Sequence, residues 1–408
     1  MTTLPEKPPL YLPLILGSLS AIPPMAIDMY LPALPMIASD IGTDEGSIQF
    51  SLMMFFAGLM LGQLFYGPLS DRFGRKPLIY FGLVVFAVAS FSCVFATRAV
   101  ELNLLRFAQG LGGSIGMVIS IAVVRDLYTG LTASRLLSLV VMVLGVAPIV
   151  APLLGSTIIS VASWRIIFVL LGLFGVVLLG FVVAILPETR LAELRNVSRP
   201  ADSLRHYAHL LVNRRFIPFV LALSIAQAGF FAYLSASASV FISVFGMSPL
   251  GYSILFAANA IGLMVAARTS PPLLAKFGAY RIVRTALIVY LIAAVALLIF
   301  VVTGFASLPY FAGLLFIAVT MLGFVMPLCS LLAMEGFGVI AGTAAALMGA
   351  FQFGLGALAS GVTAAFPSAS ALPMVACIAV CGLVATVIAL TAFPDRRPHD
   401  HGGLKPSE

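Results

Sequence analysis

Two charged residues of this chain lie within apolar stretches, where a charge is costly. Asp28 begins the segment DMYLPALP, and Arg106 lies in the segment LRFAQG. An ionisable group at the centre of a membrane helix costs about 2.5–3.5 kcal/mol on insertion scales, so its default interpretation is functional. A carboxyl group in apolar surroundings favours its neutral form, and a nearby positive charge favours the ionised form. We therefore expect proton transfer inside a membrane, with Asp28 as the proton carrier and Arg106 controlling its charge.

The elements that hold these two residues are predicted to be membrane helices. Hydrophobic residues make up 61% of the 408 residues and charged residues only 9%, against about a quarter charged in soluble domains. Apolar runs of about 20 residues, the length that spans a bilayer, recur along the chain. Backbone groups in hydrocarbon must be satisfied within a segment, which indicates helices, and the alternating strands of a barrel are not seen. We expect an all-α membrane protein with about twelve spans, near 11–33, 47–66, 78–97, 101–124, 136–160, 166–186, 216–242, 250–271, 283–303, 310–334, 342–366 and 371–393.

The depths of Asp28 and Arg106 in their spans are predicted to match. Each lies roughly five residues from the outer end of its span, which places both about 8 Å below the outer surface at about 1.5 Å per residue. A matched depth permits a pair across a central cavity. Two alternatives remain open, because Asp28 can be solvated among the outer headgroups and Arg106 can extend its side chain to that surface.

The polar segments indicate two halves and an orientation. A stretch at 187–214 separates a six-helix half at 1–186 from a second at 215–393, with a tail at 394–408. The segments PLSDRFG (68–74) and PLLAKFG (272–278) are similar, as expected for an internal repeat. Most Lys and Arg residues fall in loops on the side of both termini, which makes that side, the linker and the tail cytoplasmic. The net charge of +7 is scattered over these loops, which argues against nucleic-acid binding.

The segment GPLSDRFGRK, from Gly67 to Lys76, is predicted to be a tight charged loop between the second and third spans. Asp71, Arg75 and Asp126 all lie at the inner ends of spans two to four. We expect them to form a charge cluster that holds the outward-open state, since such a cluster can adopt two discrete arrangements. Alternatives are that Asp126 is the proton carrier, or that Arg75 binds anionic lipid.

A mostly apolar cavity with a few polar anchors is the expected substrate site. The residues predicted to line it are Tyr30, Gln109, Gln227, Phe230, Phe231, Tyr233 and Asn259. For any single aromatic residue among them, packing between helices or against lipid is the alternative role.

Several other chemistries are disfavoured. The four cysteines fall in predicted spans, which indicates apolar packing. The four histidines fall in the linker and tail, so no metal site is expected inside the membrane. No GxxxxGK[ST] loop is found, which argues against ATP hydrolysis. No set of nucleophile and base appears within the spans, so we expect no enzyme and no cofactor, with a proton gradient as the energy source.

The charged segment resembles a family signature. The residues that match the loop between spans two and three in the major facilitator superfamily of transporters are Gly67, Asp71, Arg72, Gly74, Arg75 and Lys76. Arg106, with Gln109 and Gly110, resembles the span-four motif of drug/proton antiporters, whose arginine is implied in proton coupling. The DMYLPALP context of Asp28 is similar to the span-one signature of the Bcr/CflA-type subgroup, exporters of bicyclomycin and amphenicol-like antibiotics.

The fifth span resembles the antiporter motif of such exporters. The matching residues are Gly145, Pro148, Pro152 and Gly155, whereas Ala151 and Ser156 stand where the family pattern usually has glycine. Small residues there still suit close helix packing.

The resemblance implies a proton-coupled exporter of small amphiphilic drugs that works by alternating access. The alternative is a proton-linked or facilitative importer of a polar metabolite, which would need more hydrogen-bonding groups than this chain offers in its spans. Expected partners are the drug, protons and membrane lipid, with no nucleic acid. We expect a monomer in the cytoplasmic (inner) membrane, multi-pass, with both termini in the cytoplasm.

Overall fold

The structure is a computed structural model that describes residues 8–9, 11–197, 200–304, 307–366 and 370–393. These residues form helices and connecting turns, with no β-strand in the ranges described. Twelve helical segments are long and apolar enough to cross a membrane, as predicted. The first six are α1 (Tyr11–Asp28) with η1 (Leu31–Ala33) and α2 (Leu34–Ile41), α3 (Glu45–Phe73), α4 (Arg75–Cys93), α5 (Ala99–Leu127), α6 (Gly130–Val161) and α7 (Arg165–Ala184). The second six are α10 (Ile217–Ala238) with the π-helix η2 (Ser239–Val244), α11 (Pro249–Phe277), α12 (Ala279–Val302), α13 (Leu308–Met334), α14 (Ala341–Ala364) and α15 (Leu372–Ala392); η3 (Gly338–Ile340) precedes α14.

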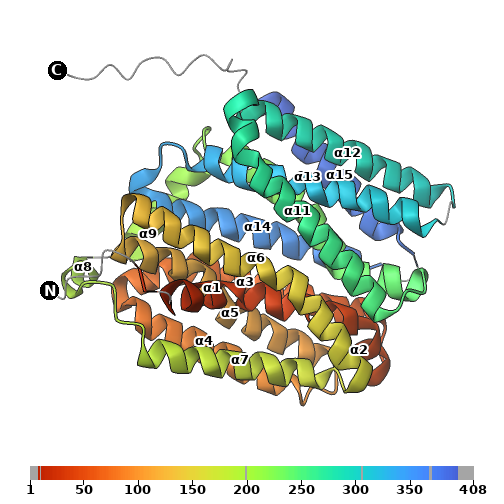
Figure 1. The fold of residues 1–408 in the computed structure, drawn as a ribbon, viewed down its shortest axis with the longest axis horizontal. Helices are drawn as coiled ribbons and strands as arrows, with labels where there is room; N and C mark the ends of the chain where they lie inside the picture. The colour runs from red at the N-terminus through yellow and green to blue at the C-terminus, as the bar shows by residue number, and fades with distance from the viewer. Residues whose placement is uncertain (1–7, 10, 198–199, 305–306, 367–369, 394–408) are drawn as a thin grey trace.

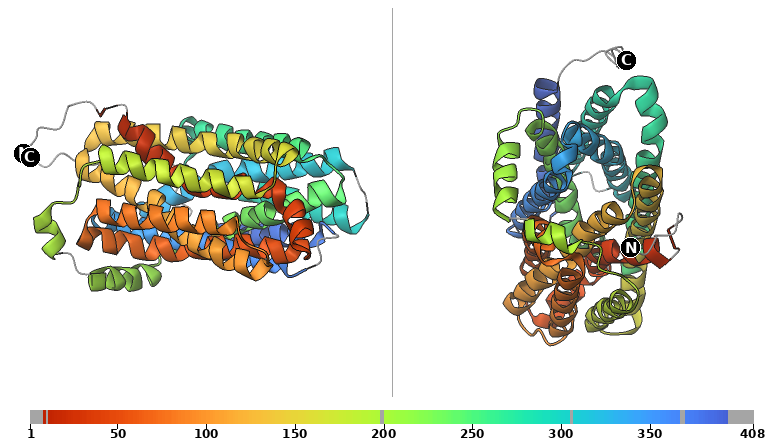
Figure 2. Two further views of the ribbon diagram at one scale, coloured as in Figure 1. Left: turned by 90° about the horizontal axis from the view of Figure 1, so that it is seen from below. Right: turned by 90° about the vertical axis from the view of Figure 1, so that its left-hand side faces the viewer.

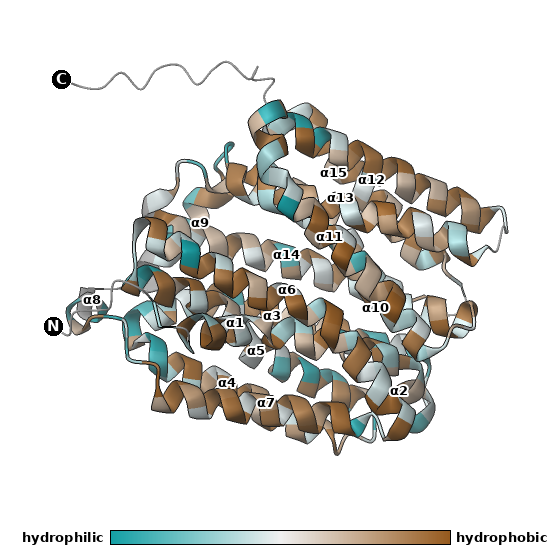
Figure 3. Ribbon diagram, viewed as in Figure 1, coloured by the Kyte–Doolittle hydropathy of each residue, from teal (hydrophilic) through white to brown (hydrophobic). Residues whose placement is uncertain are grey.

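The spans pack as two groups of six. Within the first group α5 lies between α3 and α4, and α1 packs on α6; within the second, α10 packs on α14 and α15. The groups meet along α3 with α14 and along α6 with α11, as Figure 1 shows. Figure 2 shows the spans running roughly side by side along the long axis. Figure 3 shows that apolar residues predominate along the helices, and many large apolar side chains are exposed, which suits a surface in contact with lipid.

Two short helices connect the groups and define one end of the bundle. They are α8 (Ala192–Val197) and α9 (Pro200–Leu211). The Tyr207 hydroxyl of α9 donates to the Leu64 carbonyl of α3 at 3.0 Å, and α9 also packs on α14, so it contacts both groups. We call the end of the bundle that carries α8 and α9 the linker end, and the other the opposite end.

The first span is interrupted at Asp28, the last residue of α1. The Tyr30 N–H donates to the Ile27 carbonyl at 3.1 Å, which tightens the turn, and the chain then continues through η1 and α2 to Ile41. Asp28 therefore lies well inside the span, deeper than the five residues from its outer end predicted from the sequence. The prediction failed because it ended the span at residue 33, whereas the apolar helical segment continues past the break to Ile41.

The charged segment after Gly67 is shorter as a loop than predicted. Helix α3 continues through Pro68 to Phe73, and α4 begins at Arg75, so the connection is Gly74 alone. Gly74 adopts φ = 101°, a backbone conformation that other residues rarely adopt, and its N–H bonds the Ser70 carbonyl. The charges on this segment are consequently held on rigid helix ends.

Candidate functional site

The Asp28 carboxyl lies where the two groups of helices meet. The side chain is buried at 4% exposure, and within the described ranges it forms no hydrogen bond or ion pair. Its charge acts on Tyr233 of α10 and on Tyr252 of α11, both in the second group. A buried carboxyl group without a fixed partner is expensive as an anion, so its surroundings favour taking up a proton or a group that donates hydrogen bonds.

Tyr233 and Tyr252 each belong to a hydrogen-bonded polar pair in the second group. The Asn259 amide donates to the Tyr233 hydroxyl at 3.0 Å, and the Tyr252 and Ser237 hydroxyls are 2.8 Å apart. The Asn259 carbonyl oxygen is buried without a partner in the described chain. Tyr233 and Asn259 were predicted to line the substrate site, whereas sequence reasoning missed Tyr252 because an isolated tyrosine near a span end carries no specific signal.

Arg106 lies inside the first group. Its guanidinium is fully buried and lies 4.5 Å from the Tyr30 ring centre and 4.3 Å from that of Phe55. It donates to the Ala26 carbonyl at 3.1 Å and to the Gln109 side chain. The Ala26 carbonyl lies in the last turn of α1, where carbonyls lack helical partners, so Arg106 caps the end of the helix that carries Asp28. A cation is favourable at that end of a helix.

The predicted pair between Asp28 and Arg106 is not formed. No ion pair joins them in the described chain, and Arg106 interacts electrostatically with Tyr30 and Cys93 instead. The physical reason is rotation about the helix axes. Matching depths place two residues at one level, but the packing of α5 turns Arg106 towards aromatic rings and the α1 backbone.

Tyr30 and Gln109 also lie inside the first group, which differs from their predicted place in a cavity. The Tyr30 and Ser51 hydroxyls are 2.8 Å apart, and the Gln109 amide donates to the Ser90 hydroxyl at 2.7 Å. Both side chains are fully buried. They complete a polar network around Arg106, because a buried guanidinium needs acceptors and ring faces.

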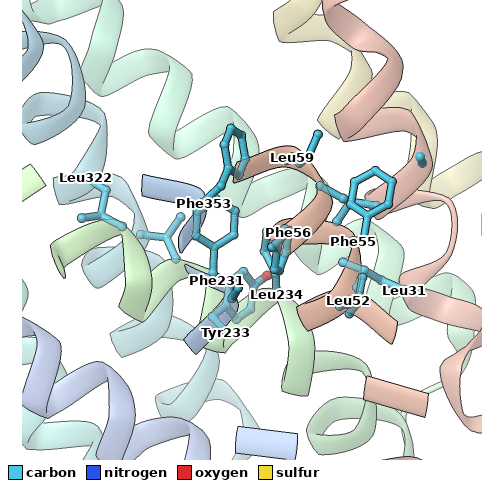
Figure 4. Close-up of a cluster of buried hydrophobic side chains, with 14 of the residues drawn as sticks. Leu31, Leu52, Phe55, Phe56, Leu59, Phe231, Tyr233, Leu234, Leu322 and Phe353 are labelled. Atoms are coloured by element: carbon cyan, nitrogen blue, oxygen red, sulfur yellow. The ribbon is translucent and has the colours of Figure 1, made fainter. Parts of the chain in front are cut away.

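Aromatic side chains join the two groups in the middle of the molecule. Phe231 of α10 packs against Phe56 of α3, with ring centres 4.5 Å apart, and against Phe353 of α14 at 5.7 Å. Figure 4 shows these rings together with Tyr233. Phe230 lies next to Tyr233 at 5.9 Å, and the Gln227 carbonyl oxygen is buried without a described partner. The predicted residues of α10 thus form the apolar surface at which the groups meet.

The glycine- and proline-rich helix α6 touches both Asp28's helix and the second group. A side chain at Gly155 would lie 2.2 Å from the Met29 carbonyl, so only glycine allows this approach. Gly145 faces Met264 of α11, and the Pro152 carbonyl accepts a hydrogen bond from Ser253 at 2.9 Å. Pro148, one turn before Pro152, lies in the same helix.

The charged residues Asp71, Arg75 and Asp126 lie together at the linker end, which is the position predicted for their cluster. Arg75 lies 2.8 Å from Asp71 and 2.9 Å from Asp126, and it donates to the Ser70 hydroxyl. Arg72 points away and is exposed. All members belong to α3, α4 and α5, so the cluster as seen connects helices within the first group.

The linker contributes residues to this cluster that sequence reasoning missed. Glu188 accepts the backbone N–H groups of Arg75 and Lys76 at 3.0 and 3.1 Å, at the start of α4. Burial opposes its ionisation, but N–H donors from Arg190, Arg75 and Lys76 outweigh burial and hold the pKa of Glu188 below its ordinary value. The Thr189 hydroxyl donates to Asp126 at 3.1 Å. The signal in the sequence was the short motif PETR at the end of the sixth span.

Hydrogen bonds join the two groups at the opposite end. The Gln49 amide of α3 donates to Ser239 at 2.9 Å, and Ser243 donates to Glu45 at 2.7 Å. Glu45 and Gln49 are one turn apart on α3, and Ser239 and Ser243 are about one turn apart on the π-helix η2. A π-helix in a longer helix often marks a functional site, and here it presents both serines to α3.

Comparison with known proteins agrees with this architecture. Residues 16–361 match the family model described as Major Facilitator Superfamily. The chain is 30% identical to a bicyclomycin resistance protein homolog of Haemophilus influenzae, over 95% of this chain and 97% of that protein. It is 28% identical to a chloramphenicol resistance protein of Pseudomonas aeruginosa, over 92% of this chain and 88% of that protein. A solved bacterial homologue of the lysosomal transporter Spinster has the same fold, with a TM-score of 0.73, 15% identity, and coverage of 94% of this chain and 96% of that one. The chain therefore belongs to the major facilitator superfamily and is a multi-pass membrane transporter of small molecules, not an enzyme.

Proposed function

We propose that this transporter exports small amphiphilic drugs in exchange for protons, and that Asp28 carries the proton. The single observation that supports this most is the buried Asp28 carboxyl, which has no hydrogen-bond or ion-pair partner among the described residues and lies just before the turn η1 that packs on α10 and α11. The resistance proteins among its relatives support drugs as the substrate class. The mainly aromatic surface formed by Phe56, Phe231 and Phe353 suits an amphiphilic molecule better than a sugar.

The proposed cycle is alternating access between residues 1–186 and 215–393, joined by the linker 187–214. With the site open outward, Asp28 takes a proton from the acidic side and the affinity for drug falls. The protonated carrier turns inward, Asp28 releases the proton, and drug occupies the freed site. One proton entering down 100 mV supplies about 2.3 kcal/mol, enough for about a fiftyfold gradient of a neutral drug.

In this cycle Arg106 acts on Asp28 through the helix backbone. It holds the Ala26 carbonyl, two residues before Asp28, and so fixes the end of α1 at the interface. The protein is proposed to work as a monomer in the cytoplasmic membrane, with both termini and the linker end in the cytoplasm. The hydrogen bonds at the opposite end then close the outer side, which suits loading of drug from the cytoplasm.

The test is transport in proteoliposomes with an imposed pH gradient and chloramphenicol as the probe. Asp28→Asn should abolish gradient-driven transport, because the amide cannot release a proton, while Asp28→Glu should retain part of it. Glu193→Gln, which removes an exposed acid of α8, is the matched control and should transport normally. Drug-induced proton release and full transport by the Asn variant would remove Asp28 from the mechanism.

A further inference from the structure

Helix α9 has an apolar face that none of the described residues covers. Tyr207 and Leu210 are buried against the bundle. Leu204 and Leu211, two turns apart and therefore on one side of the helix, are 66% and 46% exposed. In a protein with twelve membrane spans, an uncovered apolar stripe on a short surface helix is suited to the membrane interface.

The chain after α9 turns at once into a membrane span. Val212 is 79% exposed. The Asn213 carbonyl accepts N–H groups from Phe216 and Ile217 at 3.1 Å, which closes the turn that starts α10. Leu211 and Val212 consequently lie where a span enters the membrane, at the level of the lipid headgroups.

A pocket of about 330 Å³ opens at this point. Its walls come from the end of α9, the start of α10 and Ala392 at the end of α15. Most of the lining side chains are apolar, and Asn213 and Arg214 supply the polar part. Arg214 is exposed and forms no ion pair with any described residue, so its charge is not compensated within the described part of the chain.

We propose that this pocket binds an anionic phospholipid. Arg214 and Asn213 would bind the headgroup phosphate, and the stripe from Leu204 to Val212 would lie along an acyl chain. A soluble phosphate would satisfy the charge but leave the apolar stripe exposed, and a neutral lipid would leave Arg214 without a counter-charge. The combination of an uncompensated base and an uncovered apolar stripe is what favours a lipid with an anionic headgroup.

The position of the pocket gives the lipid a structural consequence. Helix α9 packs on α3 of the first group and on α14 of the second, and α10 and α15 also belong to the second. A lipid held between α9, α10 and α15 would add a second contact between the linker and the second group, beside the packing of α9 on α14. This inference does not depend on the direction of transport or on the identity of the transported molecule.

The test uses the purified full-length protein in detergent and native mass spectrometry to measure lipid binding. The probes are dioleoylphosphatidylglycerol, dioleoylphosphatidylcholine and glycerol 1-phosphate, which has the anionic group without acyl chains. Phosphatidylglycerol should bind several-fold more tightly than phosphatidylcholine. Glycerol 1-phosphate should not displace it.

Two variants and one control separate the charge from the apolar surface. Arg214→Gln should weaken phosphatidylglycerol binding about fivefold, the roughly 1 kcal/mol that one base contributes near an anionic surface, and leave phosphatidylcholine unchanged. Val212→Ser should weaken both lipids. Arg135→Gln, an exposed base at the same end of α6 in the first group, should change neither.

Three results would overturn the proposal. Equal affinity of wild type and Arg214→Gln for phosphatidylglycerol would remove the site. Displacement by glycerol 1-phosphate would mean that the pocket binds a soluble anion. If Arg135→Gln weakened phosphatidylglycerol binding as much as Arg214→Gln does, lipid binding would depend only on the total charge of this surface.

Discussion

The hydrogen bonds at the opposite end allow a quantitative test of alternating access. Gln49 to Ser239 is a buried neutral hydrogen bond, and Ser243 to Glu45 is a partly exposed bond to a carboxylate. A buried hydrogen bond contributes about 1 kcal/mol net, and solvent reduces the exposed, charged one to about the same. If both bonds exist only while this end is closed, removing the two hydroxyls should favour the open state by about 2 kcal/mol, or roughly thirtyfold in the equilibrium constant.

The perturbation is Ser239→Ala with Ser243→Ala, which leaves the volume of the side chains nearly unchanged. Spin labels at Val100 and Tyr310, exposed positions on opposite groups at this end, would report the distance between the groups in a background without reactive native cysteines. The double variant should shift the distance distribution towards longer values. Ser138→Ala, whose hydroxyl bonds only within α6, should leave it unchanged.

An unchanged distribution in the double variant would refute this reasoning. It would mean that the bonds persist in both states or are replaced by water at no cost. A shift of the same size in Ser138→Ala would instead show that the labels respond to loss of any hydroxyl.

Two further predictions concern the polar networks. Arg106→Met should abolish transport while leaving the melting temperature unchanged or higher. The reason is that two nitrogens of the buried guanidinium have no hydrogen-bond partner among the described residues, so the substitution removes their desolvation cost. A loss of transport together with a lower melting temperature would indicate a purely structural role for Arg106. Glu188, whose pKa is lowered in the folded protein, should contribute stability that is present above its ordinary value of 4.5 and is lost as pH falls through that value to the lowered one. Thermal unfolding between neutral and acid pH should therefore show a smaller decrease for Glu188→Gln than for wild type, and equal decreases would contradict the role of this carboxylate as the cap of α4.

The sequence was sufficient for features that depend on composition and spacing. Twelve spans follow from apolar runs of bilayer length, and the assembly of Asp71, Arg75 and Asp126 follows from their positions at helix ends on one side. Both are one-dimensional properties. They need only the height of each residue along the bundle.

The rotation of each helix about its axis could not be obtained in this way. Arg106 faces Tyr30 and the α1 backbone because α5 approaches α3 closely, where a side chain at Gly110 would lie 2.1 Å from the Phe55 carbonyl. A glycine in the sequence indicates that close approach is allowed, but not which helix approaches. For the same reason the sequence could not show that Tyr233 and Tyr252 lie within electrostatic range of Asp28.

The separate surroundings of Asp28 and Arg106 suggest how their roles divide. A residue can couple protonation to a conformational change only if its surroundings differ between the two states. Arg106 is enclosed by helices of one group, so a rigid movement of that group leaves its contacts with Tyr30 and Ala26 unchanged. Asp28 is buried just before the turn η1, which packs on α10 and α11 of the other group, and separating the groups would admit water to this carboxyl. The Asp28 carboxyl is therefore the group whose proton affinity must change with the conformation. The Arg106 guanidinium keeps the end of α1 in place in both conformations.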